Sequence, residues 1–291
     1  MSAASIAALV ILVATYVGVA AGGVPGLRLD RPGIAFLGGA AMIALGPLSL
    51  DEAFAAIDLH TIALLVGMMI VVAHLKVSGA FRALGSLAIK HAHAPFVLLV
   101  TITVLAGVLS AFLVNDAICL VMTPIVMRVV RALGRNPVPY LVATATASNC
   151  GSVATITGNP QNMVIGAVSK IPYSGFAAAL SPVAAFGLVA VVVVVWFSFR
   201  KEFAADGEIS PHLRTGRMHA GQVVKASLVC AGLATAFFAG APPSAAAVIG
   251  GAILLFTRQI KPMRIYREID GPLLVLFAGL FIVVAGVERA F

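Results

Sequence analysis

Long apolar stretches alternate along this chain with short polar loops. Apolar stretches of about 20 residues are long enough for a helix to cross a hydrocarbon core about 30 Å thick. The predicted spans are 4–22, 33–49, 59–76, 175–199, 222–240, 244–257 and 271–287, with an unusual, partly polar region at 95–169. This pattern predicts an all-α, polytopic membrane protein.

Composition supports the same class. Hydrophobic residues make up 61% of the chain and charged residues 10%, with a mean hydropathy of +1.08, whereas soluble domains carry about 25% charged residues. The net charge of +8 does not indicate nucleic-acid binding, because the basic residues lie in short loops rather than on one solvated face. The first apolar stretch has no basic residue before it, so we expect a retained helix rather than a cleaved signal.

The basic loops predict the topology. Lys and Arg favour the cytoplasmic side, and Arg28 and Arg31 place the first loop inside and the N-terminus outside. The basic cluster at 128–135 also belongs inside, but the stretch 95–127 is too short for two crossings, which need about 40 residues. We therefore expect a re-entrant helical hairpin at 95–127. All of the 19 Lys and Arg except Lys170 and Arg289 are then cytoplasmic, as in a multi-pass protein of a prokaryotic cytoplasmic membrane.

The chain also matches itself without gaps at a fixed offset. Ile57-Asp58 corresponds to Ile269-Asp270, Gly67 and the run 70–73 correspond to Gly279 and 282–285, and Gly38-Gly39-Ala40 corresponds to Gly250-Gly251-Ala252. The matched helices run in opposite directions across the predicted membrane, which indicates an inverted-topology repeat of the kind found in secondary transporters.

This repeat predicts the domain organisation. Residues 1–200 form a first repeat, with scaffold helices in 1–90 and a transport-type hairpin and broken helix in 91–200. A cytoplasmic linker follows at 201–220, and residues 221–291 begin a second, incomplete repeat. We expect the counterparts of the hairpin and the broken helix to lie beyond Phe291.

The first candidate site is the hairpin turn at residues 113–117. Asp116 is the only acid deep within an apolar stretch, where a charge costs at least about 2.5–3.5 kcal/mol and usually faces a functional cavity. Asn115 and Asp116 are therefore candidate ligands for an ion or a substrate. The alternative is that they only cap the free backbone groups of the turn.

The second candidate site lies in residues 147–162, which are too polar for a plain crossing. Gly158 and Pro160 interrupt a helix there, and unwound backbone in a membrane usually lines a cavity. It exposes carbonyl groups for a cation and a helix N-terminus, capped by Asn159, for an anion. The candidate residues are Ser148, Asn149, Gly151, Thr157, Gly158, Asn159, Pro160 and Asn162. A kink without a ligand is the alternative.

These two motifs carry a resemblance to a family. Asn115-Asp116 with Thr123-Pro124, followed by Gly158-Asn159-Pro160-Gln161-Asn162, resembles the ion transporter superfamily. That group includes divalent anion:sodium symporters, citrate-type permeases and arsenical pump membrane proteins. The resemblance covers roughly residues 30–200, and the start of the repeat after 213.

The resemblance implies a homodimer whose transport domain moves like an elevator against a scaffold. In sodium-coupled members a Ser-Asn-Thr tip holds sodium and a substrate carboxylate. Here the tip reads Val114-Asn115-Asp116, so only the asparagine matches. Asn115 and Gly158 are the candidate sodium ligands, sodium being a coupling ion, and no other cofactor is expected.

We therefore expect a secondary transporter of a small anion, a carboxylate or an inorganic oxyanion, driven by sodium or protons. An arsenite efflux permease or a sodium/proton antiporter on the same scaffold is the alternative, since a desolvated Asp116 could carry a proton. An intramembrane enzyme is disfavoured because Asp116 is the single membrane aspartate and no nucleophile motif is present. A non-transporting subunit stays open.

Overall fold

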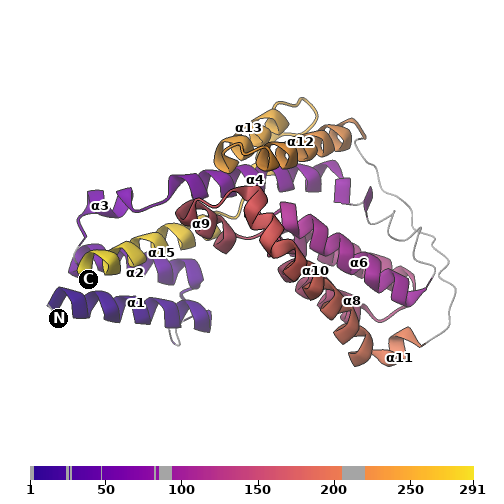
Figure 1. Cartoon of the computed structure of the whole chain (residues 1–291), viewed down its shortest axis with the longest axis horizontal. Coiled ribbons are helices and arrows are strands. Elements are labelled where there is room, and N and C mark those ends of the chain that lie inside the picture. The colour runs from indigo at the N-terminus through magenta and orange to yellow at the C-terminus, as the bar shows by residue number, and fades with distance from the viewer. Residues whose placement is uncertain are drawn as a thin grey trace. The chain divides into compact units, whose positions relative to one another are not determined.

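A computed structural model of the chain describes residues 3–23, 26, 28–46, 48–81, 83–84, 94–204 and 220–291. Every regular element in these ranges is a helix (Figure 1). The predicted loop around Lys90 and most of the predicted linker at 201–220 lie outside the described residues.

Helices of membrane-spanning length stand close to the predicted positions. Among the described residues six helices are long and apolar enough to cross a membrane. They are α1 (Ala3–Ala21), α4 (Leu59–Ser78), α6 (Pro95–Phe112), α10 (Tyr173–Ser198), α12 (Ala220–Phe238) and α15 (Gly271–Ala290). Two shorter apolar helices are α2 (Arg31–Leu45) and α13 (Pro243–Leu255). The chain is thus an all-α, polytopic membrane protein.

Three short helices are additions that hydropathy does not reveal. They are α3 (Leu50–Ala55), α11 (Arg200–Phe203) and α14 (Pro262–Tyr266). The α3 helix begins at a capping box, in which the Ser49 hydroxyl accepts from the Glu52 N–H at 3.3 Å and the Glu52 carboxylate accepts from the Ser49 N–H at 2.9 Å. The predicted span 33–49 is therefore too long. The α2 helix ends at Leu45, and Ser49, the last residue of the predicted span, already caps α3.

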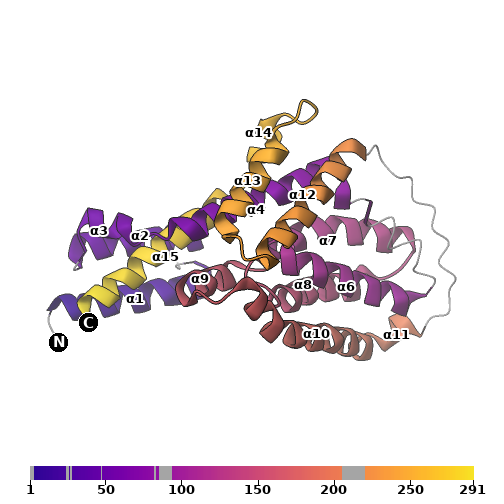
Figure 2. The ribbon, with the colours of Figure 1, turned by 45° about the horizontal axis from the view of Figure 1, so that its top comes forward.

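The described chain divides into two compact units. The first comprises residues 1–62 and 270–291. Its α1, α2 and α15 lie side by side (Figure 2). The Ser5 hydroxyl on α1 donates to the Ala290 carbonyl on α15 at 2.9 Å, so helices far apart in the sequence are bonded to each other within this unit.

The second unit comprises residues 63–269. In it, α4 lies against α12 and α13. Helices α6, α7 (Asn115–Ala132), α8 (Pro137–Ser152) and α10 form a bundle, and α9 (Pro160–Ser169) follows α8 beside it. The contact between α6 and α8 is the most extensive within the bundle. Because the units follow packing rather than sequence order, they do not test the predicted division into repeats.

Glycines allow two pairs of helices to approach closely, one pair in each unit. A Cβ added to Gly279 on α15 would lie 2.5 Å from the Ala35 carbonyl oxygen on α2, and a Cβ on Gly67 of α4 would lie 2.7 Å from the Ala247 carbonyl oxygen on α13. Gly67 corresponds to Gly279, and Ala35 to Ala247, at the offset found in the sequence. The α2–α15 and α4–α13 pairs therefore share the same close contact.

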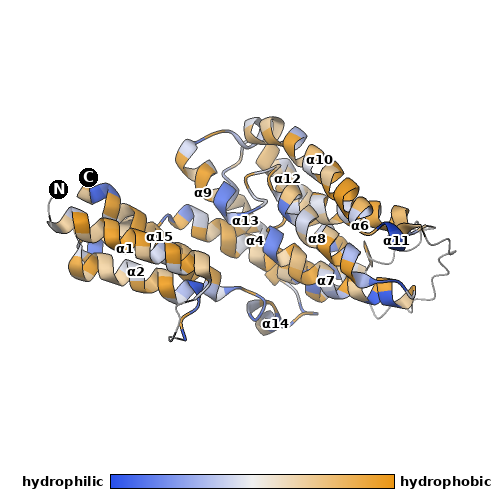
Figure 3. Ribbon diagram, turned by 90° about the horizontal axis from the view of Figure 1, so that it is seen from below, coloured by the Kyte–Doolittle hydropathy of each residue, from blue (hydrophilic) through white to orange (hydrophobic). Residues whose placement is uncertain are grey.

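Apolar side chains cover the outer faces of several helices. Figure 3 shows hydrophobic residues around most of α1 and α10, and many of them are exposed, among them Val10 at 60% and Phe186 at 76%. Faces of this kind are stable against lipid hydrocarbon rather than water.

Candidate functional site

The turn between α6 and α7 places Asn115 at the start of a helix. The α6 helix ends at Phe112, Leu113 and Val114 form the connection, and α7 begins at Asn115. Both connecting side chains are buried, which anchors the turn. Asp116 is exposed in the first turn of α7, where its negative charge complements the helix dipole.

The break between α8 and α9 forms as the sequence predicts. The α8 helix ends at Ser152, and α9 begins at Pro160, which has no N–H to satisfy. The Asn159 side chain caps α9 by accepting from the Asn162 N–H at 2.8 Å. Both features are local consequences of the Gly-Asn-Pro motif.

Asn162 holds the unwound segment together. Its buried side-chain amide donates to the carbonyl oxygens of Ser152 at 3.2 Å, Val153 at 3.4 Å and Thr155 at 2.9 Å. These carbonyls belong to the end of α8 and the break, where helical partners are missing. The side-chain nitrogen of Asn162 thus satisfies backbone carbonyls, and its role as a ligand stays a prediction.

The hairpin turn and the helix break are bonded directly to each other. The Asn115 N–H donates to the Gly158 carbonyl at 2.9 Å. The Ser148 hydroxyl donates to the Asn115 carbonyl at 2.9 Å, and the Asn115 side-chain amide donates to the Asn149 side-chain oxygen at 2.9 Å. Residues predicted from two separate motifs therefore form one polar cluster, Asn115–Ser148–Asn149–Gly158.

One acceptor in this cluster has no partner. The Oδ1 atom of Asn115 is buried and makes no hydrogen bond, and a buried unpaired acceptor costs about 1–3 kcal/mol. The amide is held in place because its nitrogen bonds Asn149. Asn115 therefore presents a fixed oxygen that a cation or a hydrogen-bond donor could satisfy.

Hydroxyl groups form a supporting layer, of which the sequence prediction included Ser148 and Thr157 but missed Ser110, Thr155 and Tyr173. Thr155 donates to the Ala111 carbonyl, and Thr157 bonds the Tyr173 hydroxyl at 2.8 Å on α10. Ser110 bonds Ser148 at 2.9 Å. The density of hydroxyl residues between 148 and 157 was a visible signal, but their partners are distant in sequence.

The two glycines of the predicted site serve close packing. A Cβ added at Gly151 would collide with the backbone of Gly107 on α6, and one at Gly158 would collide with the Ser152 carbonyl. Gly151 therefore lets α8 cross α6 closely, and only Gly158 also takes part in the polar cluster through its carbonyl.

The predicted site residues thus fall into two groups, one in the polar cluster and one in the helix break. Asn115, Ser148, Asn149 and Gly158 come together, with Asp116 beside them at the start of α7. The residues that build the break itself are Thr157, Asn159, Pro160 and Asn162. Within the described residues, no group of three or more His, Cys, Asp or Glu is placed to hold a metal ion.

Comparison with known proteins places this arrangement in context. The profile of a family described as citrate transporter (CitMHS) matches residues 7–290. An uncharacterized transporter of Mycobacterium tuberculosis is 27% identical over 298 residues, covering 98% of this chain and 68% of that protein.

Two further relatives carry more specific names. A silicon efflux transporter of Oryza sativa is 35% identical over 188 residues, which is 65% of this chain and 39% of that protein. The putative transporter arsB of Dictyostelium discoideum is 27% identical over 150 residues, which is 52% of this chain and 27% of that protein. These relatives are transporters by name, not enzymes.

Proposed function

Because this chain belongs to the citrate transporter (CitMHS) family, we propose that it is a secondary active transporter of a small anion, a carboxylate or an inorganic oxyanion. The observation that carries this proposal is the bonded cluster of the hairpin turn and the helix break, Asn115–Ser148–Asn149–Gly158. It is a polar, irregular backbone region among apolar helices, the setting in which transporters hold solutes.

Sodium or protons are the proposed driving ions. The unpaired Oδ1 of Asn115 and the carbonyl oxygen of Gly158, which has a second lone pair, offer two neutral oxygen ligands. Hard cations prefer oxygen ligands of this kind, which supports sodium as a co-substrate. Asp116, in the next position, is a proposed site for proton linkage.

The proposed mechanism is alternating access of the elevator type in a homodimer with inverted repeats. The shared contact of Gly67 with Ala247 and of Gly279 with Ala35 supports two related halves. The hydrogen bonds between α7, α8 and the break support a cluster that moves as one body. We also propose a location in a prokaryotic cytoplasmic membrane with the N-terminus outside.

A flux assay tests this proposal. The protein is expressed from the complete open reading frame that contains this chain and reconstituted into liposomes. Uptake of labelled citrate, succinate, sulfate and phosphate is measured with a sodium gradient, with a proton gradient, and with neither. We expect concentrative uptake of at least one anion with one gradient. Flux that is independent of both gradients would contradict coupled transport.

A second candidate is efflux of a hydroxylated acid such as arsenous acid, or sodium/proton antiport. The observation in its favour is that the cluster offers two acceptors, the unpaired Oδ1 of Asn115 and the second lone pair of the Gly158 carbonyl oxygen. The Asn115 N–H already bonds Gly158, Pro160 has no N–H, and Asp116 adds a carboxylate. The names of the silicon and arsB relatives agree with such a solute. Counterflow of arsenous and silicic acid, in the same liposomes, separates this candidate from anion uptake.

A further inference from the structure

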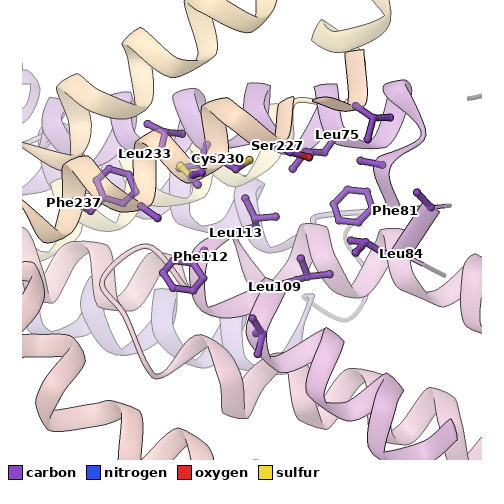
Figure 4. A pocket seen from close by; sticks show the side chains of 17 residues that line it. Leu75, Phe81, Leu84, Leu109, Phe112, Leu113, Ser227, Cys230, Leu233 and Phe237 are labelled. Carbon is purple, nitrogen blue, oxygen red and sulfur yellow. The ribbon is translucent and has the colours of Figure 1, made fainter. Parts of the chain in front are cut away.

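A large apolar cavity lies within the second unit, apart from the polar cluster. Its volume is about 390 Å³, within the range of about 300–1,000 Å³ that holds small ligands. Its walls are α4 with the segment that follows it, α6, and α12 (Figure 4). The labelled side chains that point into it include Leu75, Phe81, Leu109, Phe112 and Phe237.

The chemistry of the lining selects an apolar occupant. Of the described side chains that line the cavity, only Ser227 and Cys230 carry a polar atom, and none of these described side chains is charged. Water needs about two to four polar partners to occupy such a space. An anion or a sodium ion would lose its hydration without compensation. The cavity is therefore not a second site for the transported solute.

The shape of the cavity selects a linear occupant. Small residues at positions 227, 230, 231 and 234 fall on one face of α12, spaced as i, i+3, i+4 and i+7. The lining on this helix extends from Val223 to Phe237, about 20 Å at 1.5 Å per residue. A lipid acyl chain spans half of a hydrocarbon core of about 30 Å, so it fits along this face.

The helices around the cavity indicate that lipid hydrocarbon is the available occupant. All three helices that line the cavity, α4, α6 and α12, are membrane-spanning by length and hydropathy. The cavity is partly open rather than enclosed, so hydrocarbon from the bilayer can reach it. We propose that it binds one acyl chain of a membrane phospholipid, which lies against α12 and the end of α6.

The position of the cavity relates it to the polar cluster. Phe112 and Leu113 line the cavity, and the α6–α7 turn continues from them directly to Asn115. Phe112 also contacts Phe238, and Phe238 contacts Tyr173, the partner of Thr157. A bound acyl chain therefore supports the α6 side of the turn that carries Asn115.

Photolabelling tests this proposal. The purified protein is reconstituted into phosphatidylcholine vesicles that contain a fraction of phosphatidylcholine with a diazirine in the acyl chain. After irradiation, adducts are located by tandem mass spectrometry. We expect adducts on Cys230, Leu233 and Phe237, at positions that face the cavity. Ala234→Trp, which fills the cavity, should reduce these adducts about tenfold, the effect of losing about two buried methylene contacts.

One control and a second cavity-filling variant keep the result decisive. Leu228→Trp changes an α12 side chain that is 68% exposed outside the cavity, and it should leave adducts at the cavity positions unchanged. Ala231→Leu is a smaller filling substitution for use if Ala234→Trp does not fold, and it should also reduce them. Adducts confined to exposed positions such as Leu228, or undiminished in folded Ala234→Trp and Ala231→Leu, would overturn the proposal.

Discussion

The backbone N–H of Asn115 donates to the carbonyl oxygen of Gly158 at 2.9 Å, joining the hairpin turn to the helix break. Helix starts usually leave their N–H groups unpaired. Here one of them is paired by a carbonyl that has lost its own helical partner, so each irregular segment satisfies the other. The carbonyl and the side chain of Asn115 are bonded to α8 as well.

Substitution of Gly158 should separate the two segments. A Cβ at this position collides with the backbone of Ser152, so Gly158→Ala should cost about 1–3 kcal/mol or more. We expect a lower apparent melting temperature in detergent and a loss of flux. Gly221→Ala on α12 is the control, since nothing lies within 4 Å of its added Cβ, and it should be neutral or stabilising. Equal melting temperatures for the Gly158 variant and wild type would contradict the close contact.

The two glycine contacts between helices should respond alike. Gly67→Ala and Gly279→Ala each place a Cβ within 2.7 Å of a backbone carbonyl oxygen, so both should lower the melting temperature by similar amounts. Gly232→Ala, which has open space, should not. A loss seen for only one of the first two would show that the α2–α15 and α4–α13 pairs are not equivalent in stability.

Asn162 should matter for stability more than its neighbour. Asn162→Ala leaves three carbonyl groups, at the end of α8 and in the break, without its side-chain donor, a loss of about 1–3 kcal/mol. Gln161→Ala changes an exposed side chain next to it and should have little effect. Thermal unfolding of the two variants in one detergent makes the comparison, and equal melting temperatures would refute this role of Asn162.

The start of α3 should weaken in acid. Hydrogen bonds from the backbone and side chain of Ser49 lower the pKa of Glu52 below its usual value of 4.5. A carboxyl group with a lowered pKa stabilises the folded state above its unfolded pKa, and this contribution is lost as the pH falls through the folded pKa. Hydrogen-exchange protection of residues 50–55 should therefore fall below about pH 4.5. Glu52→Gln should remove the pH dependence, and a variant that keeps it would contradict the assignment to Glu52.

Local chemistry made part of this structure predictable. The hydropathy of each span predicted the membrane-spanning helices. Asn159 with Pro160 predicted the start of α9, because a cap and a first-turn proline act within a few residues. The bonds of Thr155 to Ala111 and of Thr157 to Tyr173 could not be predicted, because they join the break to α6 and to α10, which are distant in sequence or separated from it by α9. The capping box at Ser49 has the sequence pattern Ser-x-x-Glu. It was not predicted, because Ser49 directly follows an apolar run and was assigned to the span 33–49.

Asn115 and Gly158 are predicted site residues from two separate motifs. The structure joins them by the hydrogen bond from the Asn115 N–H to the Gly158 carbonyl, which neither motif implies alone. Asn162 is a predicted ligand because it belongs to the polar stretch 147–162 that interrupts a helix. Its side-chain nitrogen satisfies carbonyls at the end of α8 and in the break, a role that the sequence does not distinguish from solute binding, so its role as a ligand stays a prediction.

Flux through Asn115→Ala tests most directly whether Asn115 stands at the solute or ion site. Uptake into liposomes is compared with that of wild type and of Asn136→Ala, an equivalent change at the cap of α8. We predict that Asn115→Ala folds but loses about ten- to a hundredfold in flux, the effect of about 1–3 kcal/mol of lost interaction, while Asn136→Ala transports. Wild-type flux through a folded Asn115→Ala protein would contradict a place for Asn115 at that site.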